Sequence, residues 1–339
     1  MKNRKCYRAF IYLLWVWGNI TLSYAQQYIP FAHHVFNASH INPAYVGYKE
    51  QWNAQMGIRS QWAKVDGAPR TGYASIDGLV DPLTRRHGVG AQIAYDKIGV
   101  QSATSLFVSY ALRLQIDDED EQRFSLGLSG GVTQYGLNGN DLVYIDENDP
   151  FIPRGMITTW RPDLRLGAFY YHTNYYLGVA VHDLFANADS REDFIYNQNS
   201  LEGLYRNTHM YVMAGGAMPL AEGFIFRPSI LVKDDLVGPT VLDINAMGIF
   251  DEKFWVGAAF RSRSKIFNRD YDDYTLARFS SFKSIGLLAL LHASPKLRIG
   301  YSFEHNLNKI AGMNSGTHEI SLGVSWGKVT NPFSKPKYF

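Results

Sequence analysis

The sequence predicts an all-β protein, a transmembrane antiparallel β-barrel of the outer membrane with about fourteen strands, short periplasmic turns and long extracellular loops. Three observations favour this fold class. The chain has few charged residues, apolar and polar residues alternate in many segments, and these segments are long enough to cross a membrane. Charged residues make up 19% of the 339 residues and aromatic residues 14%, whereas a soluble domain has about 25% charged residues. A soluble β-sandwich or propeller is the competing interpretation, because its sheets alternate in the same way.

Composition excludes several other classes. The mean hydropathy is −0.19, and the sequence contains no run of about 18 apolar residues, so a bundle of transmembrane helices is excluded. Net charge is only +2, with the basic excess at the N-terminus. Without a basic domain or stripe, we expect no nucleic-acid partner.

The first 25 residues have the three parts of a secretory signal peptide. An apolar run at 10–17 is too short to anchor the chain in a membrane, and Ser23–Ala25 offers a small-residue cleavage site. Cys6 is the one cysteine, so the mature chain is expected to lack disulfides and cysteine-ligated metals. The positive charges before the run are Lys2, Arg4, Lys5 and Arg8.

After the signal peptide, residues 26–50 are polar and aromatic, and we place them on the periplasmic side, with the option that they fold back into the barrel mouth. Residues 51–327 form the predicted barrel, and 328–339 a periplasmic tail, interpreted either as a contact for periplasmic partners or as a flexible end. Alternation predicts strands at 51–62, 71–79, 88–96, 103–116, 122–136, 162–171, 175–182, 206–217, 222–233, 238–249, 253–262, 281–293, 296–305 and 317–327.

The connections between these strands alternate in length. Every second connection is short or simple, and the other set contains all the long ones, at 137–161, 183–205, 263–280 and 306–316. Outer-membrane barrels have this arrangement, with turns in the periplasm and loops outside, whereas a sandwich has no reason for it. Many strands also reach the roughly 9–11 residues that cross a bilayer.

Aromatic residues near strand ends are interpreted as interfacial girdles, with ordinary core packing as the alternative. They are Trp52, Trp62, Tyr110, Trp160, Tyr175, Tyr176, Trp255 and Trp326.

The polar phase of the strands contains charges that should face the lumen. Arg59 and Gln61 lie opposite Met56 and Ile58 on the first strand. Because a buried arginine usually needs a carboxylate, a lumen salt-bridge ladder is favoured over a charged path that selects a solute. The other lumen charges are Arg113, Arg123, Arg165, Arg261, Arg298, Asp96, Glu304 and Glu319.

No catalytic motif or cofactor site is predicted, and we expect no enzyme, although a dispersed hydrolase triad stays open. Gly127–Gly131 reads G-x-S-x-G but lies inside a strand, without the helix that a nucleophile elbow needs. His318-Glu319 lacks the second histidine of a zinc motif, and His33, His34 and His40 lack an acidic partner. A solvated loop is favoured over a calcium site for Asp141, Asp146, Glu147 and Asp149.

Several short motifs, in order along the chain, resemble those of the PorP/SprF family of Bacteroidetes outer-membrane proteins. Asn42–Gly47 is similar to N-P-A-Y-x-G, Arg59–Trp62 to R-x-Q-W and Gly67–Thr71 to G-A-P-x-T. The remaining matches are Asp96–Gly99 with D-x-x-G, Ile299–Glu304 with I-G-Y-x-[FY]-[DE], and Gly316–Ile320 with G-x-H-E-[IL].

The resemblance implies a component of the type IX secretion and gliding motility apparatus that assists secretion or surface anchoring of a partner protein, an adhesin or cargo. Its partners would be that protein, other secretion components, outer-membrane lipid and a peptide segment bound in the lumen. A porin for small solutes is the alternative. For the loop at 62–71, a partner-docking corner and a self-packed turn stay equally open. The candidate structural or partner residues are Asn42, Pro43, Arg59, Gln61, Trp62, Pro69, Thr71, His318 and Glu319.

Overall fold

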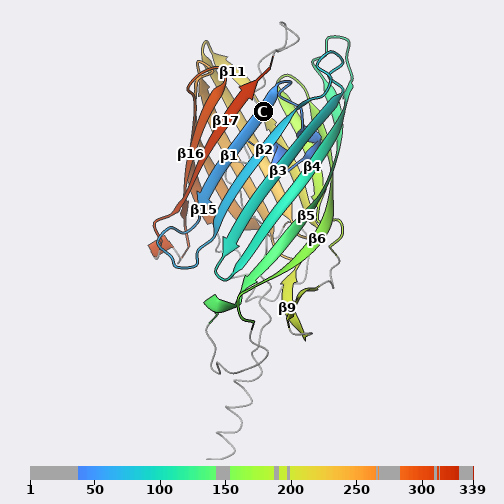
Figure 1. Cartoon of the computed structure of the whole chain (residues 1–339). Helices are drawn as coiled ribbons and strands as arrows, with labels where there is room; N and C mark the ends of the chain where they lie inside the picture. Colours follow the sequence, from blue (N-terminus) through green and yellow to red (C-terminus); the bar gives the residue numbers. More distant parts are fainter. Residues whose placement is uncertain are drawn as a thin grey trace, which may run out of the picture.

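Fourteen strands form a closed antiparallel barrel in the computed structural model (Figure 1). The structure describes residues 37–142, 153–186, 191–196, 199–264, 266, 283–308, 311–312, 314–327 and 339, so the predicted signal peptide lies outside the described residues. The barrel strands are β1 (Trp52–Ser60), β2 (Arg70–Leu79), β3 (His87–Ile98), β4 (Gln101–Gln115), β5 (Arg123–Asn138), β6 (Met156–Tyr171), β7 (Tyr175–His182), β10 (His209–Gly216), β12 (Phe224–Asp234), β13 (Thr240–Phe250), β14 (Phe254–Ser264), β15 (Lys283–His292), β16 (Leu297–Asn306) and β17 (Thr317–Trp326).

Each strand pairs with its neighbours along the chain, and the barrel closes where β1 pairs with β17. The short β11 (Met218–Ala221) extends the pairing of β12 beside β10. Closure satisfies every edge, as a sheet in lipid requires. Among the described residues, no helix is long and apolar enough to cross a membrane.

Every predicted strand overlaps a strand of the barrel, but two predicted loops contain further structure. The strand expected at 162–171 begins at Met156, because β5 and β6 stay paired as two 16-residue strands. The loop expected at 183–205 contains a separate hairpin, β8 (Arg191–Tyr196) and β9 (Asn199–Tyr205). In Figure 1 this hairpin lies at the same end of the barrel as the tip of β6.

The two faces of the wall follow the predicted alternation. Met56 and Ile58 on β1 point outward, with 56% and 65% of their surface exposed. Arg59 on the same strand points into the lumen and is buried. The interior is therefore polar and charged, and the outside is apolar, as a barrel in lipid requires. The aromatic prediction is partly wrong, because Tyr176 is buried in the lumen and Trp255 packs against an inner cluster.

A short segment before β1 fills part of the lumen. Residues 37–50, called the plug below, contain two 3-10 turns, η2 (Ala38–His40) and η3 (Pro43–Tyr45). A further 3-10 turn, η4 (Gly139–Asp141), follows β5 at the loop end. The plug supplies Ile41, Ala44, Tyr45 and Tyr48 to the largest apolar cluster of the described residues. The apolar core thus forms between plug and wall, where the wall is otherwise polar.

Candidate functional site in the barrel lumen

Asn42 fixes the plug to the wall. Its side-chain oxygen accepts a hydrogen bond from the Ala44 amide at 2.9 Å and so caps η3. Its side-chain nitrogen donates to the carbonyls of Ala168 on β6 and Val179 on β7, at 3.0 and 3.2 Å. Asn42 is fully buried, and one side chain therefore both shapes the turn and attaches it to two strands.

Glycines in the wall make room for this turn. A Cβ added to Gly127 on β5 would overlap the backbone of Pro43 and Ala44, and one added to Gly167 on β6 would overlap the Asn42 side chain. Alternation along β5 places Gly127 on the lumen face, but alternation alone does not predict the plug seat. The signal was present in the glycines of adjacent strands, but only the strand register brings them together.

Ion pairs hold the last residue of the plug, Glu50, at the short-turn end of the barrel. Glu50 contacts Arg85 at 3.5 Å and Arg113 at 3.3 Å. Asp120 in the next turn pairs with Arg85 and, at 2.5 Å, with Arg123. This cluster links the plug to the turns that follow β2 and β4, so it resists withdrawal of the plug.

An aromatic group surrounds the plug on the side of β6 and β7. The ring of Tyr48 lies 4.8 Å from that of Tyr171, and the Tyr176 ring lies 4.8 Å from that of Phe339. The Tyr45 hydroxyl donates a hydrogen bond to the Phe339 carbonyl. Burial raises the pKa of Tyr45 and Tyr48, so both hydroxyls stay protonated. Phe339 is thus buried against the plug; residues 328–338 of the predicted tail lie outside the described residues.

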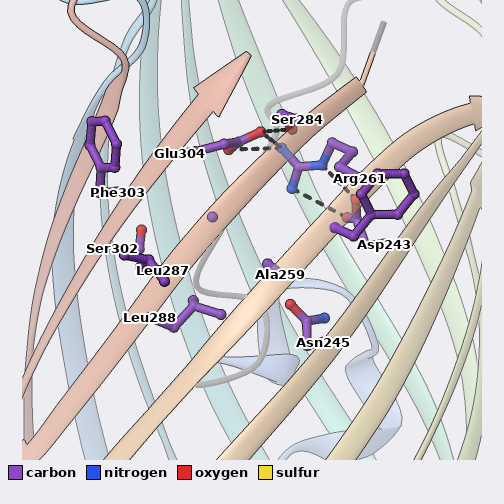
Figure 2. A pocket seen from close by; sticks show the side chains of 12 residues that line it. Asp243, Asn245, Ala259, Arg261, Ser284, Leu287, Leu288, Ser302, Phe303 and Glu304 are labelled. Carbon is purple, nitrogen blue, oxygen red and sulfur yellow. Dashed lines mark hydrogen bonds and ion pairs between the residues drawn. The ribbon is translucent and has the colours of Figure 1, made fainter. Parts of the chain in front are cut away.

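A ladder of ion pairs runs along the inner face of the wall from β12 to β17. Lys233 contacts Asp243 at 2.7 Å, and Asp243 accepts from Arg261 at 2.5 Å. Figure 2 shows Arg261 between Asp243 and Glu304, with an Arg261–Glu304 distance of 3.1 Å. The Ser284 hydroxyl donates to Glu304 at 2.5 Å. A small cavity of about 20 Å³ beside these residues has room for about one water molecule.

The ladder continues to the strand pair that closes the barrel. Arg59 on β1 contacts Glu304 at 2.9 Å and Glu319 on β17 at 3.2 Å. The Tyr73 hydroxyl on β2 donates to the other Glu319 oxygen at 3.2 Å. The predicted arginine–carboxylate ladder is therefore present for these lumen charges. Asp96 instead accepts from Thr71 at 2.5 Å, Arg165 stacks on Phe107, and Arg298 bonds to Asn53.

Most of the remaining motif residues lie around this closing seam. The Trp62 backbone amide donates a hydrogen bond to the Thr317 hydroxyl at 3.3 Å. The Gln61 backbone amide donates one to the carbonyl of the buried Pro69 at 3.0 Å. His318 pairs with Ser60 in register and bonds to the Tyr301 hydroxyl at 2.8 Å on the outer face. The motif residues thus come together in two places, the plug seat and the seam between the first and last strands.

A third charged group lies where the long loops begin. Arg206 contacts Asp183 at 3.0 Å and Asp163 at 3.4 Å, and His209 contacts Asp183 at 3.1 Å. Burial alone would raise the pKa of Asp183, but His209 and Arg206 outweigh it and hold that pKa well below its usual range. The cluster holds the base of the β8–β9 loop against the barrel.

Within the described part of the chain, no group of three or more histidine, cysteine or acidic side chains is arranged to hold a metal ion. Asp141 accepts from Asn138 at 2.8 Å in the η4 turn. The other three loop acids proposed for calcium, and His33 and His34, lie outside the described residues. The G-x-S-x-G sequence lies inside β5, where the Ser129 hydroxyl bonds to the Val108 carbonyl at 3.1 Å.

The closed fold with its lipid-facing surface and charged lumen defines an outer-membrane β-barrel protein. A model of the family described as "Type IX secretion system membrane protein PorP/SprF" matches residues 23–324. The chain therefore belongs to the PorP/SprF family and is located in the outer membrane. This family is structural or transport-related and not enzymatic.

Solved structures support the same fold. The CymD monoaromatic hydrocarbon channel is 10% identical with a TM-score of 0.54, covering 89% of this chain and 94% of that one. The toluene transporter TbuX of Ralstonia pickettii is 11% identical with a TM-score of 0.50, covering 86% and 93%. At this identity the similarity concerns the barrel fold alone. No curated protein sequence matches the chain.

Proposed function

We propose that this barrel is an outer-membrane component of type IX secretion and gliding motility that assists secretion or surface anchoring of an adhesin or cargo protein. The observation that carries the proposal is the partly filled lumen of a barrel from a secretion family. The plug and the ladder fill space that a diffusion channel would leave to water. A filled barrel is suited to binding a partner at its rim.

The loop end is the proposed contact surface for the exported protein. There β5 and β6 project as a long ribbon, and the β8–β9 hairpin extends beside it (Figure 1). Loops on a rigid scaffold commonly carry recognition. The short-turn end, where the chain passes from the plug into β1, would face the other secretion components. We further propose that residues 1–25 are removed on export and that the tail leaves the last strand on the periplasmic side, with its last residue, Phe339, returned to the plug.

Deleting the gene and comparing surface proteins of mutant and parent cells tests this function. We expect one or a few proteins to leave the surface-labelled fraction while their total amount in the culture is maintained, and the intact gene to restore them. Unchanged surface display of every cargo protein would contradict the proposal.

A solute channel is the second candidate, because the barrel resembles two proteins whose names describe a channel and a transporter. A path for small solutes through the barrel would begin from the small cavities of about 20 and 10 Å³ in the interior. Current across a planar bilayer separates the two functions: a steady open-channel current favours transport, and its absence favours the secretion role.

A further inference from the structure

Two cations lie side by side on the outer face of the barrel at the loop end. Arg70 on β2 and Lys97 on β3 are direct partners in the strand register. Their chain neighbours Thr71 and Asp96 are bonded to each other in the lumen at 2.5 Å. Because side chains alternate across a strand, Arg70 and Lys97 both point outward, and both are exposed.

This arrangement is unfavourable for the isolated protein. Like charges directly opposite each other on antiparallel strands destabilise the pair. Among the described residues, no carboxylate lies within ion-pair distance of either Arg70 or Lys97. The two cations therefore form a concentrated positive site at the rim, and an anion from outside the protein would relieve the repulsion.

The surface next to the cations is an apolar strip of small residues between larger side chains. Toward the barrel middle, the outward residues of β2 are Gly72 and Ala74, and a Cβ added to Gly72 would meet nothing within 4 Å. Large exposed side chains border this low strip on both flanking strands. They are Ile58 (65% exposed) and Met56 (56%) on β1, and Tyr95 (45%) and Ile93 (47%) on β3.

Both cations lie at the ends of their strands, where a strand that spans the membrane reaches the lipid headgroups. Tyr95 points outward near the end of β3, a position that suits an interfacial tyrosine, and Lys97 is two residues, about 7 Å, farther along the strand. We propose that Arg70 and Lys97 bind the phosphate of an outer-leaflet lipid, with one acyl chain lying over Gly72 and Ala74. Arginine presents a planar fork that matches phosphate oxygens, and lysine adds a point charge.

Lipid retention by the full-length mature protein tests the site. Protein in phosphatidylcholine nanodiscs is mixed with phosphorylated lipid A or with dephosphorylated lipid A, and the bound lipid is counted by native mass spectrometry. We expect wild type to retain the phosphorylated form at least about tenfold more tightly than the Arg70→Gln/Lys97→Gln variant, as loss of charge-assisted hydrogen bonds predicts. The dephosphorylated form should show no such difference.

The matched control is Arg86→Gln/Lys253→Gln, which removes the same charge from exposed residues in turns at the opposite rim. It should retain lipid as wild type does. Stability in detergent gives a second reading that does not depend on retention. Without lipid, Arg70→Gln/Lys97→Gln should melt no lower than wild type. Added phosphorylated lipid A should raise the melting temperature of wild type and of the control, but not that of Arg70→Gln/Lys97→Gln.

Equal retention by wild type and Arg70→Gln/Lys97→Gln would overturn the proposal, as would equal loss in the Arg86→Gln/Lys253→Gln control. That first outcome is also expected if the two cations bind an acidic protein instead of a lipid. The proposal uses only the barrel surface, so its failure would leave the secretion role untouched.

Discussion

Arg59 on the first strand and Glu319 on the last are direct register partners, and their side chains form a 3.2 Å ion pair inside the barrel. Each side chain is almost completely buried. The pair therefore stands at the one place where two ends of the sheet, 260 residues apart, must meet. Family motifs at both ends of the chain converge on this seam.

Removing one member of the pair should weaken the barrel. Arg59→Ala removes the arginine from the buried Glu319 carboxylate, and breaking a buried pair costs about 3–5 kcal/mol. We expect a lower urea midpoint for the folded barrel in detergent. Arg59→Ala/Glu319→Ala should lose less than the sum of the single variants, because the charges are coupled.

Ile58→Ala is the control for that experiment, since Ile58 is next to Arg59 but faces lipid. Its effect on the urea midpoint should be much smaller. Additive losses from the two charge variants would show that the pair contributes nothing to closure.

A side chain at Gly127 should displace the plug. The Cβ of Gly127→Ala would overlap the backbone at Pro43 and Ala44, and overpacking of a close contact costs typically about 1–3 kcal/mol. We expect residues 37–50 to become accessible to protease while the strands remain folded. Cleavage followed by mass spectrometry measures this directly.

Gly130→Ala supplies the matched comparison on the same strand, because a Cβ there meets only Leu164 at an ordinary 3.5 Å. It should leave the plug protected. Equal protection in Gly127→Ala would mean that the plug does not depend on this close approach.

The plug should loosen in mild acid. Burial, together with the positive charge of Arg165, lowers the pKa of His40 from 6.5 to about 3. A released plug would carry a histidine of ordinary pKa, so it binds more protons than the seated plug at any pH between these values. The seated state is thus fully favoured above about pH 6.5 and loses about 2 kcal/mol by pH 5.

Labelling of a Ser39→Cys variant by a thiol reagent would report this release, because the predicted mature chain has no other cysteine. The labelling rate should rise as the pH falls from 7.5 to 5. In a His40→Phe background the ring still packs on Tyr73, and the rate should vary far less. An identical pH dependence in both backgrounds would exclude His40 as the cause.

The wall of the barrel was predictable because outward residues face lipid and are apolar, whereas the inward residues between them are mostly polar. Met56, Ile58 and Arg59 are assigned to their faces by their order in the chain alone. Aromatic residues follow this rule less clearly, since Tyr176 and Trp255 suit an interface and a core equally well, and here they face inward. Pro162, which lacks an amide hydrogen, makes the outer half of β6 a poor strand by sequence.

The plug seat was not predictable from one sequence. Asn42 and Pro43 indicate a turn, but the partners of that turn are Gly127, Gly167 and the carbonyl of Val179. These groups lie more than eighty residues away and come together only through strand register. Likewise, the lumen location of Arg59 follows from alternation, whereas its two partners, Glu304 and Glu319, follow from closure of the barrel.

The conductance of the purified protein in a planar bilayer tests the central claim, that the lumen is filled and the barrel serves a partner protein. Wild type should show a current near that of the bare membrane, and Gly127→Ala should show frequent openings as the plug leaves its seat. A steady, large current through wild type, equal to that of Gly127→Ala, would contradict the account.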